Sequence, residues 1–381
     1  MMTPDSEAAL ADAIKSANGP LSVQGGGTRG FAPAGQVLSA RGLRGITLYE
    51  PGALTLVARA GTLVSDIEQT LAAEGQRLAF EPMDHRVLLG TTGAPTIGGV
   101  IAGNISGPRR IQGGAARDYA LGVRFVDGAG TIVKNGGRVM KNVTGYDLVK
   151  LMAGSFGTLG VLTEVSLKVL PAPETESTLM LRHLEDTDAI TAMSRAMSSP
   201  YEVTGAAHSA KTEEEAAVTL LRIEGFEGSV AYRIAALKKL LADMGAEMAV
   251  LDAEASAEIW TRVRDVCAMS ERPGDIWRVS CKPSEAAGLA RRAEAEGWFF
   301  DWAGGLIWVR TSEGTDLRAK LGPFDGHATL VRASGETRAH LPVFHPEAPG
   351  VARLSAGLRK RFDPRGILNS GLMGQKHRED A

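Results

Sequence analysis

Residues 96–107 read TIGGVIAGNISG, a run of small residues that also supplies asparagine and serine donors. Glycine lets the backbone approach a neighbour closely because it has no side chain, and it destabilises a fold when it is placed idly. The 46 glycines of this 381-residue chain crowd between Gly25 and Gly160. This density indicates a ligand site lined by backbone, although one such run alone also has a purely structural explanation.

A second glycine run lies upstream, where residues 25–30 read GGGTRG after a short strand predicted over 21–24. The run satisfies the G-x-G-x-x-G dinucleotide fingerprint, but a Rossmann site also needs a helix to begin at that turn. Residues 31–35 read FAPAG and do not favour a helix. We therefore expect the loop to bind an anion through its own N–H groups, with Thr28 adding a hydroxyl. A flexible surface loop is the alternative for this motif taken alone.

The segment between the two runs favours a strand–turn–strand–helix unit. Apolar residues over 46–50 and 54–60 flank the turn Pro51-Gly52, which predicts a hairpin, and Thr62 is placed to cap the following helix. Residues 89–114 show almost no periodicity and are expected to form an ordered, loop-rich stretch. Two glycine runs separated in this way fit one long ligand, a dinucleotide whose pyrophosphate meets the first run.

The length favours two or three domains. We expect residues 1–172 to form an α+β ligand-binding domain and residues 173–345 a smaller α+β cap domain. In the cap, glycine thins out and helical and strand patterns alternate. The basic amphipathic helix predicted over 351–362 belongs to a C-terminal segment, residues 346–381, which is expected to return to the first domain.

Composition excludes several classes of protein. The net charge of −2 argues against a nucleic-acid partner. Two cysteines, Cys267 and Cys281, are too few for an iron–sulfur cluster or a cysteine-rich zinc site, and we expect them to be reduced thiols of a cytoplasmic protein. No secretory signal and no apolar stretch of about 18 residues is present, so no direct membrane span is expected.

Five motifs together, in this order, carry a family resemblance. They are the two glycine runs, DYALG at 118–122, KNVTGYDL at 141–148 and GSFGTLGVLTE at 154–164, and FDPRGILN at 362–369 adds a closing segment. The set resembles the FAD-binding domain of the p-cresol methylhydroxylase (PCMH) and vanillyl-alcohol oxidase flavoproteins, and of FAD-linked 2-hydroxy-acid oxidoreductases in particular. The KNVTGYD string resembles the glycolate oxidases, most closely their FAD-binding accessory subunit.

The resemblance implies a two-subdomain FAD-binding PCMH-type domain with a smaller α+β cap domain. Many covalent members carry a histidine in the first glycine loop, where Thr28 and Arg29 stand here, so FAD is expected to bind non-covalently. The first run would wrap the pyrophosphate, the second would line the ribityl chain and the ring, Val161 would meet the adenine half, and Asn369 would close over the ring. The cofactor residues implied are Gly25, Gly26, Gly27, Thr28, Arg29, Gly30, Pro82, Thr96, Ile97, Gly98, Gly99, Gly103, Asn104, Ser106, Gly107, Gly160, Val161 and Asn369.

No catalytic residue is assigned by the sequence. Oxidation of a hydroxy acid needs a base for the hydroxyl, a cation for the carboxylate and flavin N5 as hydride acceptor. Catalytic relatives use a histidine-rich, metal-assisted cluster that includes a Glu-His pair, which is absent here, so no metal site is expected. His327, Arg332 and Arg109 are the candidates for base and clamp. The aromatic run at 298–302 is expected to be a core strand rather than a substrate box.

The resulting hypothesis is an FAD-dependent oxidoreductase subunit that oxidises glycolate to glyoxylate. It would act with a catalytic flavin subunit and an iron–sulfur subunit, and it would be peripheral at the inner membrane only through these partners. Three alternatives remain open. The first is a self-contained FAD oxidase or dehydrogenase of a small 2-hydroxy acid or alcohol, and the second is a non-catalytic scaffold that keeps the fold. The third is an enolpyruvyl-glucosamine reductase, which the KNVTGYDL string disfavours.

Overall fold

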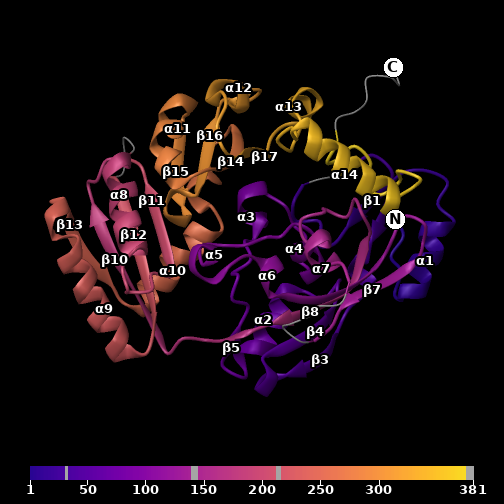
Figure 1. Ribbon diagram of the computed structural model, residues 1–381, viewed down its shortest axis with the longest axis horizontal. Coiled ribbons are helices and arrows are strands. Elements are labelled where there is room, and N and C mark those ends of the chain that lie inside the picture. Colours follow the sequence, from indigo (N-terminus) through magenta and orange to yellow (C-terminus); the bar gives the residue numbers. More distant parts are fainter. Residues whose placement is uncertain (31–32, 139–144, 212–215, 375–381) are drawn as a thin grey trace. The chain divides into compact units, whose positions relative to one another are not determined.

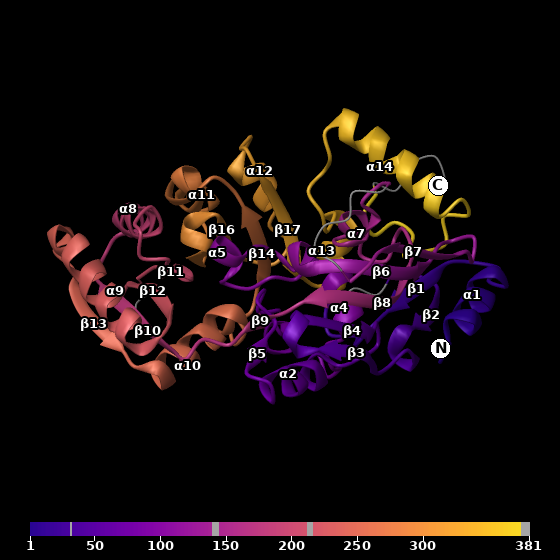
Figure 2. The same ribbon diagram turned by 60° about the horizontal axis from the view of Figure 1, so that its bottom comes forward.

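The computed structural model describes residues 1–30, 33–138, 145–211 and 216–374 (Figure 1, Figure 2). The chain divides into two compact units. The first unit comprises Met1–Ser106, Gly114–Ala172 and Pro346–Ala381, and the second comprises Gly107–Gly113 and Pro173–His345. The sequence predicted that residues 1–172 form a single domain. Residues 107–113, which belong to the second unit, were not part of that prediction.

The first unit is built on a five-stranded antiparallel sheet with the order β3-β4-β8-β6-β7. Its strands are β3 (Ile46–Glu50), β4 (Thr55–Arg59), β6 (Ala120–Val126), β7 (Ile132–Gly136) and β8 (Val161–Lys168). The predicted hairpin at Pro51-Gly52 is confirmed, since β3 and β4 pair across a 3-10 turn over Pro51–Ala53. The strands β5 (Gln76–Arg77) and β9 (Leu170–Pro171) form a separate, short antiparallel pair.

Helices α2 (Val64–Ala72), α4 (Ile97–Ala102) and α7 (Leu148–Met152) share one apolar core with this sheet. The prediction that Thr62 caps α2 is wrong. The helix has Leu63 at its N-cap position, and the Thr62 hydroxyl is instead hydrogen-bonded to the backbone of Gly45, at 3.0 Å from its nitrogen and 3.2 Å from its oxygen. Thr62 therefore fixes the entry to the β3–β4 hairpin.

The stretch 89–114, expected to be loop-rich, also contains short helices. The second glycine run contains helix α4, whose N-cap Thr96 accepts a hydrogen bond from Gly99 N at 3.4 Å. Ile97, Val100 and Ile101 are buried, at the i, i+3 and i+4 spacing of a helix face. Short helices flank this region, α3 (His85–Leu89), α5 (Arg110–Gly113) and α6 (Ala116–Tyr119).

A two-stranded parallel sheet, β1 (Leu21–Gln24) with β2 (Gln36–Ser39), packs against helix α1 (Glu7–Lys15). After helix α14 (Pro349–Phe362) the chain comes alongside β1. There Leu21 N donates to Ile367 O at 2.7 Å, and Asn369 N donates to Leu21 O at 3.0 Å. The C-terminal segment thus completes the edge of the unit that carries the first glycine run.

The second unit is an eight-stranded antiparallel sheet with the order β13-β10-β12-β11-β15-β16-β14-β17. Its strands are β10 (Thr175–Arg182), β11 (Gly205–Ser209), β12 (Val218–Gly225), β13 (Glu247–Leu251), β14 (Asp275–Ser280), β15 (Gly297–Asp301), β16 (Leu306–Thr311) and β17 (His327–Arg332). The predicted aromatic core strand is confirmed as β15, where Phe299 and Phe300 are buried. Trp302 lies just beyond the strand, in a 3-10 turn.

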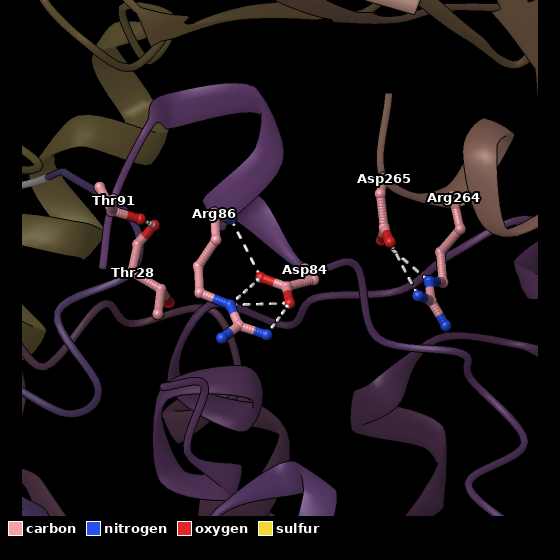
Figure 3. A network of polar contacts seen from close by, with 6 residues as sticks. All are labelled: Thr28, Asp84, Arg86, Thr91, Arg264 and Asp265. Carbon is pink, nitrogen blue, oxygen red and sulfur yellow. Dashed lines mark hydrogen bonds and ion pairs between the residues drawn. The ribbon is translucent and has the colours of Figure 1, made fainter. Parts of the chain in front are cut away.

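Alternation along the strands divides the helices of this unit between two clusters. Leu179 and Leu181 of β10 belong to the core formed with α8 (Asp186–Met197), α9 (Glu227–Leu240), α11 (Ala286–Ala293) and α12 (Leu317–Leu321). Met180 between them packs with Trp260 of α10 (Ala253–Arg264). At the end of α10, Arg264 pairs with Asp265 at 2.8 Å (Figure 3). A last helix is α13 (Gly335–His340).

In the part of the chain that the structure describes, no helix has the length and apolarity that a membrane crossing requires.

Candidate cofactor site

Both glycine runs line the same pocket in the first unit. The open space inside the pocket, the solvent at its mouth included, is about 990 Å³. The sequence-predicted residues that line it are Gly25, Gly26, Gly27, Thr28, Arg29, Gly30, Thr96, Gly98, Gly99, Gly160, Val161 and Asn369. Two segments about 70 residues apart in the chain therefore share one cavity, as a long ligand requires.

The glycines are needed first for the contact of one backbone with another. A Cβ on Gly26 would lie 1.7 Å from Ala94 O, and a Cβ on Gly98 would lie 2.6 Å from Ala60 Cβ. Gly27 and Gly30 have φ values of 72° and 65°, a region that side chains disfavour. The absence of side chains thus brings the first run against residues 93–96, and the pocket forms where the two runs meet.

Arg29 is the charged group of the pocket. Its Nη2 donates to Gly99 O, its Cζ lies 5.6 Å from the centroid of the Phe156 ring, and its buried Nη1 has no hydrogen-bond partner among the described residues. Burial lowers the pKa of Arg29 to about 10, so the guanidinium remains a cation at neutral pH. A Cβ on Gly103 would lie 1.8 Å from Nη1. The site therefore holds a cation with an unused donor, which suits an anionic ligand.

Polar contacts fix the loops around the pocket (Figure 3). The Thr91 hydroxyl donates to Thr28 O at 2.9 Å, which holds the first glycine run. Asp84 caps helix α3, and its carboxylate accepts from Arg86 Nη2 at 2.6 Å. Met83 and His85, on either side of this cap, line the pocket. Sequence reasoning missed both of them, because no glycine or motif marks this turn.

The Asn369 amide holds neighbouring backbone at the edge of the pocket. Its Oδ1 accepts from Val23 N at 2.7 Å and its Nδ2 donates to Phe156 O at 2.8 Å. Phe156 and Gly157 also line the pocket. They belong to the GSFGTLG motif, which signalled the family but was not assigned a contact. The three residues join the C-terminal segment, β1 and the loop before β8 into one wall.

The remaining predicted cofactor residues do not line this pocket. Ile97 lies in the core. Asn104 Oδ1 accepts from Arg117 N at 3.0 Å, and Ser106 Oγ accepts from Ala116 N at 2.9 Å. Gly107 belongs to the second unit. The others are Pro82, beside Met83, and Gly103, whose small size leaves room for Arg29.

Two of the three catalytic candidates have structural contacts in the second unit. Arg109 is buried and forms an ion pair with Glu224. Arg332 donates to the carbonyl oxygens of Gly274 and Ser270, both at 3.2 Å. Neither arrangement resembles an open carboxylate clamp.

His327 begins β17 and shares a sheet face with Arg278 of β14, because Ser280 pairs with His327 and Arg278 pairs with Thr329. Sequence reasoning missed Arg278, since nothing in its strand distinguishes it. Among the described residues, no three histidine, cysteine, aspartate or glutamate side chains are grouped as a metal site.

Comparison with known proteins agrees with this geometry. The FAD binding domain family matches residues 1–136. The fold is similar to that of the VAO-type flavoprotein MtVAO615 from Myceliophthora thermophila C1, with a TM-score of 0.66 over 95% of this chain and 76% of that chain at 13% identity. The chain has the fold of the VAO-type flavoproteins with an FAD-binding PCMH-type domain, and its cofactor is FAD. The predicted fold class and the prediction of FAD are confirmed, and non-covalent binding stays a prediction.

The sequence relatives are more specific. The chain is 34% identical over 359 residues, 93% of its own length and 92% of that protein, to glycolate oxidase subunit GlcE of Escherichia coli (strain K12). It is 34% identical over 175 residues, 45% of this chain and 36% of that protein, to glycolate oxidase subunit GlcD of Bacillus subtilis (strain 168). The chain belongs to the family of glycolate oxidase subunit GlcE. Of the string that first suggested glycolate oxidase, residues 141–144 lie outside the described residues.

Proposed function

We propose that this chain is the FAD-binding subunit of a glycolate oxidase complex that converts glycolate to glyoxylate. The observation that carries the proposal is the end-to-end similarity to a glycolate oxidase subunit, which spans both units rather than the FAD domain alone. In this reaction glycolate loses a hydride from its α-carbon and a proton from its hydroxyl. FAD supplies the hydride acceptor, and its electrons then pass to a partner.

In this proposal the pocket of the first unit holds FAD non-covalently. The N–H groups of Gly25–Gly30 would surround the pyrophosphate, Arg29 would give its unused donor to an anionic group, and Thr96, Gly98 and Gly99 would lie along the ribityl chain and ring. Gly160 and Val161 adjoin the adenine half. Two observations support this placement. The backbone at Gly26 and Gly98 is packed so closely against its neighbours that no side chain fits, and Arg29 Nη1 has no hydrogen-bond partner among the described residues. Neither Thr28 nor Arg29 offers a histidyl nitrogen for a flavin bond.

The proposed partners are a catalytic flavin subunit and an iron–sulfur subunit. With two cysteines in 381 residues, this chain lacks the thiolates for a cluster of its own, so onward electron transfer requires another chain. Peripheral association with the inner membrane would come through these partners. Tagging the chain in its source cell and identifying the co-purifying proteins tests this part. A second flavoprotein and a protein with ferredoxin-type cysteine spacing are expected, and recovery of the chain alone at native expression would contradict the proposal.

Anaerobic reduction separates the complex from the self-contained enzyme. If the chain depends on its partners for turnover, FAD in the purified chain stays oxidised with glycolate, whereas glycolate-dependent dye reduction by the complex is lost when this chain is omitted. Bleaching of the flavin in the isolated chain by glycolate, D-lactate or an alcohol would establish the self-contained enzyme instead. A colourless chain that takes up no FAD would establish the scaffold, and bleaching by NADPH would indicate a reductase.

A further inference from the structure

Two arginine side chains of the second unit contact one indole ring. The Cζ atom of Arg110 lies 4.7 Å and that of Arg278 lies 4.8 Å from the ring centroid of Trp302. The two arginines come from helix α5 and strand β14, which are more than 160 residues apart in the chain. An aromatic face attracts a guanidinium at this distance, so Trp302 holds two cations close together that would otherwise repel each other.

Trp302 is held firmly in this position. Its indole Nε1 donates to Gly107 O at 3.0 Å, and its backbone N donates to the carboxylate of Asp301 at 2.7 Å. Trp302 and Ala303 both have positive φ, 52° and 54°. A non-glycine residue in this region costs about 1–3 kcal/mol and persists only where its surroundings enforce it, which is common at ligand sites. The backbone is therefore strained at Trp302 and Ala303, where it positions the indole ring.

Charged groups of both signs act on Arg278 beside the ring. Arg110 and Asp301 act electrostatically on Arg278, one of the same and one of the opposite sign. Burial, together with the neighbouring Arg110, lowers the pKa of Arg278 to about 10, so Arg278 is still charged at neutral pH. Within the described residues, no hydrogen-bond acceptor meets its guanidinium. A desolvated guanidinium without an acceptor suits a ligand that carries a negatively charged group.

His327 lies at the same place on the sheet and contributes no charge. Partial desolvation, the cations Arg278 and Arg110, and the neighbouring His345 lower the pKa of His327, so its imidazole is neutral at pH 7. A neutral imidazole keeps a lone pair that can accept a hydrogen bond from a hydroxyl. Cations and an acceptor are thus grouped on one face of the second unit.

We propose that Arg110, Arg278 and Trp302 form a binding site for the carboxylate of a small 2-hydroxy or 2-oxo acid, with His327 beside the acid's second carbon. A planar guanidinium binds a carboxylate through two parallel N–H donors, which explains arginine rather than lysine at this place. The choice of acid, glycolate or glyoxylate, rests on the proposed function, whereas the existence of a carboxylate site does not. A carboxylate side chain of a partner protein is the competing occupant.

Calorimetric titration of the full FAD-loaded chain tests this site without turnover. Glyoxylate and glycolate are expected to bind, while glycolamide, which replaces the carboxylate by a neutral amide, binds at least about tenfold more weakly, as loss of one charge-assisted hydrogen bond implies. Equal affinity for glycolate and glycolamide, or no binding of either acid to the wild-type chain, would overturn the proposal. The latter outcome would leave a partner's carboxylate as the occupant.

Substitution identifies the residues. Arg278→Gln and, as a second variant, Arg110→Gln are expected to weaken glyoxylate binding at least about tenfold, the effect of one charged hydrogen bond. Arg292→Gln, an equal change of charge at an exposed position of helix α11, leaves it unaltered. Unchanged flavin content shows that a variant is folded. If both variants are folded and bind glyoxylate as tightly as Arg292→Gln does, the site is refuted. Acid binding without co-purifying partners would instead refute the proposed complex and leave this site standing.

Discussion

The space at Gly26 is smaller than a methyl group, since a Cβ there would lie 1.7 Å from Ala94 O. Gly26→Ala is therefore expected to push the first glycine run away from residues 93–96 and open the pocket. Overpacking of this kind costs about 1–3 kcal/mol, so the affinity for FAD should fall roughly tenfold or more. Gly52→Ala, which adds a methyl group in open space, is the matched control. Fluorescence titration of apo-protein with FAD measures both, and equal affinities would contradict this account of the site.

The residue scale also shows where sequence reasoning stops. The glycine runs were recognisable because glycine is needed for backbone contact, whatever the ligand. The contact between Arg278 and Trp302 exists only in the folded chain, where strand β14 and the turn after β15 come together. A pattern along the sequence does not reveal it. Arg109 and Arg332 were plausible clamps from their residue type, but their partners are distant in the chain: Glu224 of β12 for Arg109, and backbone carbonyls in the segment before β14 for Arg332.

Helix α1 is tied to the central sheet through one carboxylate. Glu7 accepts hydrogen bonds from Thr163 Oγ1 of β8 at 2.6 Å and from Arg124 Nε of β6 at 3.1 Å. Burial acts to raise the pKa of Glu7, but these hydrogen bonds and the Arg124 charge outweigh it and lower the pKa below its ordinary 4.5. Because the folded pKa is the lower one, this contribution to stability is complete above about 4.5 and is lost as the pH falls through the lowered value.

Glu7→Gln is therefore expected to destabilise the chain at pH 7, by roughly 1 kcal/mol or less because the pair is partly exposed. The difference from wild type should shrink as the pH falls below the ordinary glutamate pKa. Urea unfolding at a series of pH values measures this. Asp12→Asn, on the same helix and exposed, serves as control. A difference that stays constant down to the acid limit would contradict the assigned role of the carboxylate.

The C-terminal segment is joined to the first glycine region by Asn369. Asn369→Ala removes the partners of Val23 N and Phe156 O and places alanine at a φ of 43°. An unsatisfied buried backbone group costs about 1–3 kcal/mol, so a drop of roughly that size is expected in the free energy of unfolding, together with weaker FAD binding. Asn18→Ala, at an exposed asparagine of the same unit, should change neither. Normal stability of Asn369→Ala would show that these hydrogen bonds do not hold the segment.

Most elements were predictable at this scale because their periodicity was clear, including the β3–β4 hairpin and the aromatic strand β15. Helix α4 was not, because two glycines among six residues hide the buried face formed by Ile97, Val100 and Ile101. Thr62 has the residue type of a helix cap, yet Gly45 competes for its hydroxyl. Local signals of this kind are overridden when a tertiary partner is closer.

For the whole molecule, FAD and folding are linked by mass action. A ligand that binds only the folded chain stabilises it by about 2.7 kcal/mol at a free concentration of 100 times Kd. The thermal midpoint of the apo-chain should rise with added FAD, and the Gly26→Ala variant should need correspondingly more FAD for the same rise. Calorimetry over a series of FAD concentrations measures this. A midpoint that does not depend on FAD would mean that the pocket is not a cofactor site.

The central claim is that two glycine runs form one pocket that holds FAD without a covalent bond. The most direct test is the flavin content of the purified chain, measured after acid precipitation separates free from protein-bound flavin. We predict close to one FAD per chain in the supernatant and no flavin in the pellet. A chain that carries no flavin and takes up none would contradict the claim, and flavin that remains in the pellet would contradict non-covalent binding.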